Sequence, residues 1–221
     1  MLKRTASPVS LPVGWAVFMV SLKEMIGFEV EAEDGSAGRI SDFFLEETDW
    51  KVGYAVVSVG GFLSGERWLV SVAELRPAAS AAVMKTLRSR AELAAHSPRG
   101  LMTKEEEGWA LAHGHRPPTG DSESQDPQSP WRSFNSILGC RIAASDGGYG
   151  VLDDALVDPD RWLIQYFVGR SHAWKKKPSV LIPIAWVKEI SPTAETVDVS
   201  VSRDALEREP SYKPESHGHP H

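Results

Sequence analysis

An internal repeat, at an offset of 112 residues, is the feature that most constrains the fold of this chain. Residues 21–75 align with residues 133–187 without a gap. Identical pairs include Ser21/Ser133, Gly27/Gly139, Asp34/Asp146, Gly35/Gly147, Gly38/Gly150, Asp42/Asp154, Trp50/Trp162, Tyr54/Tyr166, Val56/Val168, Leu69/Leu181 and Ala73/Ala185. Self-similarity at a fixed offset is the signature of a duplicated structural unit. The sequence therefore predicts two domains of one fold.

Both copies have the pattern of a small β-domain. Alternating apolar residues predict strands with one buried face. These inward faces are Phe28-Val30-Ala32, Ile40, Val52-Tyr54-Val56 and Trp68-Val70-Val72, and in the second copy Cys140-Ile142-Ala144, Leu152, Ile164-Tyr166-Val168 and Val180-Ile182-Ile184. Asp34-Gly35 and Asp146-Gly147 favour tight hairpin turns, because glycine tolerates the positive φ that such turns require. Gly38 and Gly150 begin the next strand. Pro183 places its strand end at an edge or a bulge, since proline donates no ladder hydrogen bond.

The ends of the two copies differ. Ser202 is a good N-cap for a short helix that begins at Arg203 and that Pro210 limits. In the first copy, residues 83–95 have stronger helical character. Residues 99–132 are rich in Pro, Gly, Ser and acidic side chains in their second half, a composition typical of a linker. The predicted organisation is an arm at 1–20, copy 1 at 21–98, a linker at 99–132, copy 2 at 133–213 and a disordered tail at 214–221.

Composition excludes several classes of protein. With 221 residues, 42% hydrophobic residues and a net charge of −6, the chain is neither disordered nor suited to coat nucleic acid, and no DNA partner is expected. Its single cysteine, Cys140, excludes an intrachain disulfide and favours the cytoplasm, and we expect this residue to be inert core. The longest apolar stretch, residues 9–20, is too short for a membrane-spanning helix.

The second copy reads ILGCRIAASDGGYGVLDDALVDPDRWLIQYFVG, followed by VLIPIAWVKEI, VDVS and ALEREPSY. This pattern resembles the PRC-barrel family, a small β-barrel found in the photosynthetic reaction-centre H subunit and in the C-terminal domain of a ribosome maturation factor. The tandem layout resembles a widespread bacterial group of duplicated PRC-barrel proteins. The resemblance implies a mainly β fold of two small barrels in tandem, each with a short C-terminal helix or turn. None of the motifs that carry it is catalytic.

Asp42 and Asp154 are the repeated polar residues of most interest. Ideal alternation would bury each carboxylate, because each lies two positions after an inward residue. A β-bulge at this point would turn the carboxylate away and let Phe43-Leu45 and Ala155-Val157 continue the core face. We expect a hydrogen-bond anchor to loop amides, with a ligand or proton site as the alternative. The repeated structural and turn residues are thus Asp34, Gly35, Gly38, Asp42, Asp146, Gly147, Gly150 and Asp154.

One basic cluster interrupts the acidic chain. Its members are Arg170, His172, Lys175, Lys176 and Lys177, with Trp174 among them. Cations with an interleaved aromatic ring can bind RNA or an anionic membrane surface. The alternative, which we favour, is a solvated hairpin tip whose lysines discourage edge pairing. The acidic run Asp153, Asp154, Asp158 and Asp160 lacks the glycine and distal glutamate of a calcium loop.

The sequence therefore predicts a non-enzymatic adaptor with no catalytic residues, cofactor or metal site, whose protein partner it does not identify. We expect the two copies to pack together, or the chain to form a homodimer. The resemblance and the basic cluster imply one alternative each. One is a cytoplasmic component associated with photosynthetic electron transport, and the other is RNA, ribosome or anion binding through Lys175–Lys177.

Overall fold

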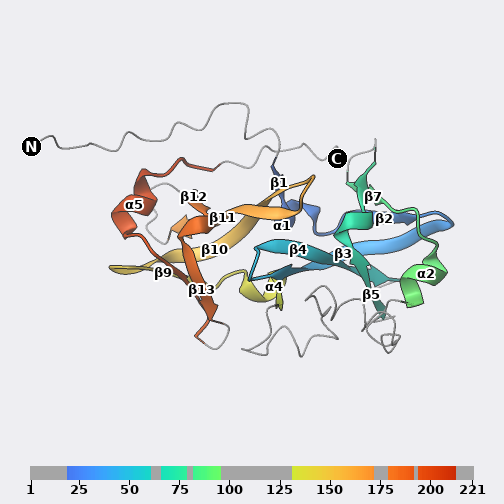
Figure 1. Cartoon of the computed structure of the whole chain (residues 1–221), viewed down its shortest axis with the longest axis horizontal. Coiled ribbons are helices and arrows are strands. Elements are labelled where there is room, and N and C mark those ends of the chain that lie inside the picture. The colour runs from blue at the N-terminus through green and yellow to red at the C-terminus, as the bar shows by residue number, and fades with distance from the viewer. Residues whose placement is uncertain are drawn as a thin grey trace, which may run out of the picture.

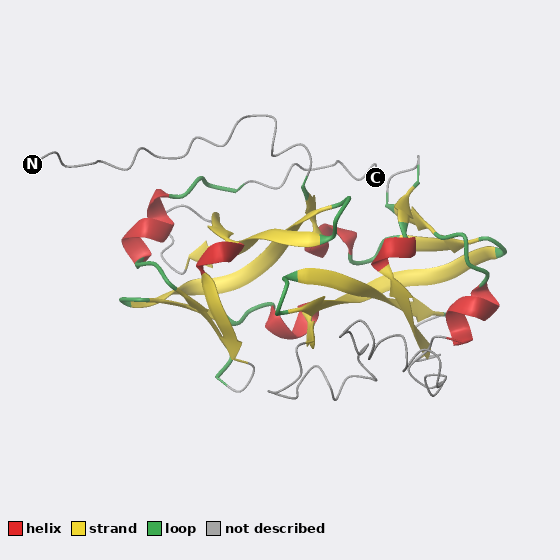
Figure 2. Ribbon diagram, in the orientation of Figure 1, coloured by secondary structure: helices red, strands yellow, loops and turns green. Residues whose placement is uncertain are grey.

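The structure is a computed structural model that describes residues 19–60, 66–78, 82–95, 131–171, 179–191 and 194–212. It is mainly β, as predicted, and its two halves repeat one order of elements (Figures 1 and 2). The first half contains β2 (Glu29–Ala32), β3 (Gly35–Glu46), β4 (Lys51–Val59), β5 (Glu66–Ser71), η2 (Val72–Glu74), β6 (Arg76–Pro77), β7 (Val83–Lys85) and α2 (Arg90–Ala95).

The second half follows the same plan. It contains β9 (Arg141–Ala144), β10 (Gly147–Asp158), β11 (Leu163–Ser171), β12 (Ser179–Pro183), η4 (Ile184–Trp186), β13 (Val187–Ser191), β14 (Thr196–Val199) and α5 (Arg203–Arg208). A short strand and a one-turn helix precede each half: β1 (Val20–Ser21) with α1 (Leu22–Met25), and β8 (Trp131–Ser133) with α4 (Phe134–Ile137). Val20, Trp131 and Arg132 therefore belong to strands, although the predicted boundaries assign them to the arm and the linker.

One sheet runs through both halves in the order β13-β14-β9-β10-β11-β4-β3-β2-β7-β6. Neighbouring strands are antiparallel except at β2–β7 and β9–β14, which are parallel. The pairing among the described residues follows an open path, so it does not close either half into the barrel expected from the sequence. The main hydrophobic core is continuous, since it includes buried residues of both halves.

β-Bulges determine which side chains of the long strands face this core. In each half, Ser41 or Asp153 is the extra residue in one strand, and Phe43 and Leu45, like Ala155 and Val157, then face the core. The sequence pattern indicated this bulge as one way to continue the core face. A second bulge, at Gly53 and Gln165, was not indicated.

The predicted third-strand face is wrong because of the second bulge. Val52 faces the core, but Tyr54 and Val56 lie in a separate cluster with Phe44, Leu69 and Trp131. In the second half Ile164 faces the core, whereas Tyr166 and Val168 lie with Leu156, Leu181, Met19 and Tyr212. An extra residue in a strand reverses the alternation of every side chain after it.

The predicted helix over residues 83–95 is also wrong in its first part. Val83–Lys85 form β7, which pairs in parallel with β2, and the helix begins only at Arg90. Tertiary pairing therefore overrides local helical propensity at this point. In the second half the short helix α5 begins after Ser202, whose hydroxyl accepts a hydrogen bond from Ala205 N, as predicted.

Candidate functional site

The segment that precedes each half is exchanged onto the other half. Strand β1 pairs with β10, and β8 pairs with β3. Figure 1 shows α1, in blue, beside β10, and α4, in yellow, beside β3. Each half therefore donates a strand and a helical turn to its neighbour, and the contacts between the halves form the candidate site.

Asp154 binds the exchanged segment of the first half. Ser21 Oγ donates to Asp154 Oδ2 at 2.5 Å, and Lys23 N donates to Oδ1 at 3.0 Å. Ala155 N also donates to Oδ1, at 2.7 Å. The residue is buried, and burial raises the pKa of its carboxyl above the ordinary value despite these hydrogen bonds. Ser21 in turn caps α1 by accepting from Glu24 N.

Asp42 makes the same contacts in the opposite direction. Ser133 Oγ donates to Asp42 Oδ2 at 2.5 Å, and Asn135 N donates to Oδ1 at 2.9 Å. Phe43 N donates to the same oxygen at 2.8 Å. Ser133 caps α4 through Ser136 N. The two repeated aspartates are thus reciprocal anchors between the halves, related by the offset of the repeat.

The two repeated tryptophans complete this two-fold pattern. Val52 N donates to Trp162 O and Ile164 N donates to Trp50 O, each at 2.8 Å. Both tryptophans have a positive φ, 54° and 57°, a conformation that is rare for a bulky side chain. Their rings pack across the interface: Trp50 meets Phe167 edge-on with centroids 5.6 Å apart, and Trp162 meets Phe43 at 6.4 Å.

One set of contacts breaks the two-fold symmetry. Arg132 Nη2 lies 3.1 Å from Glu47 Oε2, and only 5% of the Arg132 side chain is exposed. Glu47 Oε1 accepts from Ile190 N at 3.0 Å, so one carboxylate contacts two elements of the second half. The offset of the repeat places Val20 and Pro159 at the corresponding positions, and neither can form this ion pair.

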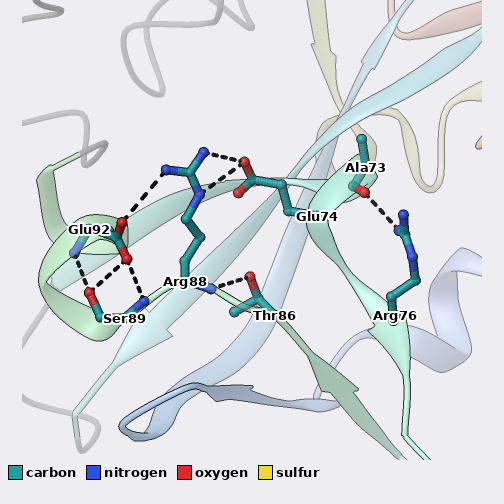
Figure 3. A network of polar contacts seen from close by, with 7 residues as sticks. All are labelled: Ala73, Glu74, Arg76, Thr86, Arg88, Ser89 and Glu92. Carbon is teal, nitrogen blue, oxygen red and sulfur yellow. Dashed lines mark hydrogen bonds and ion pairs between the residues drawn. The ribbon is translucent and has the colours of Figure 1, made fainter.

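Asp34 and Asp146 act within their own halves. Asp34 Oδ1 accepts from Arg90 N at 2.8 Å, and Asp146 Oδ1 accepts from Arg203 N at 2.8 Å. Each carboxylate therefore stabilises the N-terminus of the C-terminal helix of its half. Beside α2, Ser89 and Glu92 form a capping box, and Arg88 bridges to Glu74 at 2.6 Å (Figure 3).

The repeated glycines serve the backbone. Gly35 and Gly147 have φ of 129° and 131° at the hairpins. At Gly38 and Gly150, a Cβ atom would collide with the carbonyl oxygen of Ser58 or Arg170 on the adjacent strand. Close strand approach therefore requires glycine at both positions.

Of the predicted basic cluster, only Arg170 lies among the described residues. Arg170, on β11, is 59% exposed and places Nε 3.3 Å from Asp153 Oδ1, which also contacts Lys23 Nζ at 3.0 Å. His172 and Lys175, Lys176 and Lys177 lie outside the described residues, as do residues 99–130 and the tail. Arg170 thus lies against Asp153 of β10, while the positions of the other four candidates are not described.

Cys140 is buried, and burial raises the pKa of its thiol. No group of three His, Cys, Asp or Glu side chains that could hold a metal ion is found among the residues with described positions. None of the helices in the described ranges is long and apolar enough to cross a membrane.

The exchange itself was missed by the sequence reasoning, and so were the roles of Ser21, Ser133, Glu47 and Arg132. A signal existed for the serines, because the identical pair Ser21/Ser133 begins each copy in the position of a helix N-cap. Glu47 and Arg132 had no such signal, because neither is repeated.

Comparison with family models identifies one domain of the chain. Residues 19–90 match the family model of the PRC-barrel domain. This range begins with β1 and ends at the start of α2, so it covers the first half including its exchanged segment. No curated protein matches the chain closely enough to serve as a relative. The chain therefore carries a PRC-barrel domain at residues 19–90, which confirms the predicted family resemblance for the first half.

Proposed function

We propose that the chain is a non-enzymatic protein-interaction module with an adaptor role in the cytoplasm. The observation that carries this proposal is the reciprocal exchange between the halves. Each half already binds a folded protein surface, by strand pairing, buried hydrogen bonds and aromatic packing. The location rests on the single cysteine.

The use of the repeated carboxylates supports the non-enzymatic part of the proposal. Asp42 and Asp154 are occupied by hydroxyl and amide donors, while Asp34 and Asp146 hold helix termini. General acid–base catalysis needs a titratable group within reach of a substrate atom. Carboxylates held in this way between packed elements are suited to structural support instead.

Affinity capture with the tagged full-length chain tests the proposal. A protein partner should be retained from native extract, be displaced by excess untagged chain, and capture this chain in the reciprocal experiment. If no protein shows saturable, reciprocal binding, the adaptor role is wrong. A small molecule that co-purifies and is chemically converted by the chain would overturn the non-enzymatic assignment.

A further inference from the structure

The contacts between the halves form a self-complementary surface. They occur as pairs related by the repeat: Ser21–Asp154 with Ser133–Asp42, Val52–Trp162 with Ile164–Trp50, and β1–β10 with β8–β3. Such an arrangement has the geometry of a two-fold dimer interface, in which one patch meets a copy of itself. The serines, aspartates and tryptophans of these pairs are identical in the two copies, whereas the backbone amides that donate to the tryptophans belong to different residues, Val52 and Ile164.

Among the described residues, these contacts join the two halves directly. The hydrogen bonds and the strand pairs all join residues at or before position 60 to residues at or after position 131. From these observations we infer that this surface recognises a PRC-barrel half as such, and that a half from a second copy of the chain can replace the chain's own half. The inference rests on the proposed interaction role and names a partner for it.

The unsymmetrical contacts determine which halves can pair. A pair of second halves would bury Arg132 opposite Pro159, without the carboxylate that Glu47 supplies. A buried cation without its partner is strongly unfavourable. A pair of first halves would place Glu47 opposite Val20. The Arg132–Glu47 ion pair therefore favours exchange that joins one first half to one second half.

The covalent link between the two halves determines the protein concentration at which exchange with a second copy occurs. Covalent linkage of two modules in one chain gives them an effective concentration on the order of millimolar, so the chain's own half is favoured at micromolar protein concentration. A second copy competes when the local concentration approaches that value, or when the connection is cut. Assembly through exchanged halves is thus controlled by concentration.

A cleavable version of the full-length chain tests the inference. A protease site is inserted within residues 104–126, and the folded protein is cleaved there. Unlabelled and ¹⁵N-labelled samples are then mixed in urea, the urea is removed, and complexes are weighed by native mass spectrometry. We expect the cleaved halves to remain associated, with about half of the complexes being hybrids of labelled and unlabelled halves, each containing one first and one second half.

Variants identify the surface responsible. Asp42→Ala with Asp154→Ala removes both anchors and should weaken association of the cleaved halves roughly tenfold or more. Asp34→Ala with Asp146→Ala is the matched control, because these aspartates act within their own halves, and hybrids should form as in the parent. Separation of the halves on cleavage, failure of the cleaved protein to refold, or complexes without hybrids would each overturn the inference. Capture of a different protein from extract would still support the proposed function.

Discussion

Asp154 has only 5% of its surface exposed, and three donors satisfy its carboxylate: the Ser21 hydroxyl and the amides of Lys23 and Ala155. Asp154→Ala would leave these buried donors without an acceptor, so we expect the free energy of unfolding to fall by roughly 2–4 kcal/mol. Urea denaturation measures this. Asp153→Ala is the control, because Asp153 makes only partly exposed ion pairs and should cost below about 1 kcal/mol. Equal losses in the two variants would contradict the anchor role.

The raised pKa of Asp154 determines how stability depends on pH. Because burial favours the protonated form in the folded state, the contribution of Asp154 is fully present below the unfolded pKa, about 3.9, and is lost as the pH rises through the folded pKa. The stability of the parent relative to Asp154→Asn should therefore decrease with rising pH from about 4 and then level off. Urea titrations at several pH values measure the difference, and an increase with pH would show that the pKa is lowered instead.

Gly150 illustrates a steric requirement without unusual backbone geometry. A Cβ atom at this position would collide with the carbonyl oxygen of Arg170 on the paired strand. We expect Gly150→Ala to lower the midpoint of thermal unfolding, with a loss of roughly 1–3 kcal/mol from overpacking. Gly148 lies two residues earlier in the same strand and has open space around it, so Gly148→Ala is the matched control. A Gly150→Ala protein as stable as this control would rule out the collision.

At the scale of the element, α2 depends on a carboxylate from a distant hairpin. Asp34 accepts from Arg90 N, at the first turn of the helix. Asp34→Ala should cost about 1 kcal/mol, the typical net contribution of one hydrogen bond, because the Ser89–Glu92 capping box remains in place. The loss should be local, so hydrogen exchange should accelerate in residues 90–95 but not in α5. Uniform acceleration in both halves would mean that Asp34 supports the whole fold rather than this helix.

Which side chains of a strand face the core could be predicted from the sequence only where its bulge could be predicted. The bulge at Ser41 and Asp153 was predictable, because regular alternation would have buried the repeated aspartates. The bulge at Gly53 and Gln165 was not, because Val52-Tyr54-Val56 alternates equally well without it. Val83–Lys85 form a strand only through pairing with β2, a long-range contact that local propensity does not contain.

At the scale of the whole molecule, the duplication was predictable but the exchange was not. Ser21 can in principle reach Asp42 of its own half or Asp154 of the other, and the repeated residues are identical in both cases. The distinction depends on where β1 and β8 lie in the sheet, which only the three-dimensional structure specifies. For the same reason the ion pair of Glu47 and Arg132 could not be foreseen, since its partners are far apart in the sequence and unrepeated.

Exchange also predicts how the molecule unfolds. The core is continuous across the halves, and each anchor aspartate holds the other half's helix, so local losses in one half should be transmitted to the other. We expect the parent to unfold in urea in a single transition that is the same by tryptophan fluorescence and by circular dichroism.

Asp42→Ala with Asp154→Ala should uncouple the halves and separate the two probes, because Trp50 and Trp162 lie at the interface, whereas circular dichroism reports all strands. In Asp34→Ala with Asp146→Ala, both probes should still coincide at a lower midpoint. If the anchor variant also unfolds in one coincident transition, the aspartates stabilise the halves separately, and the coupling between them depends on the aromatic packing and the shared sheet alone.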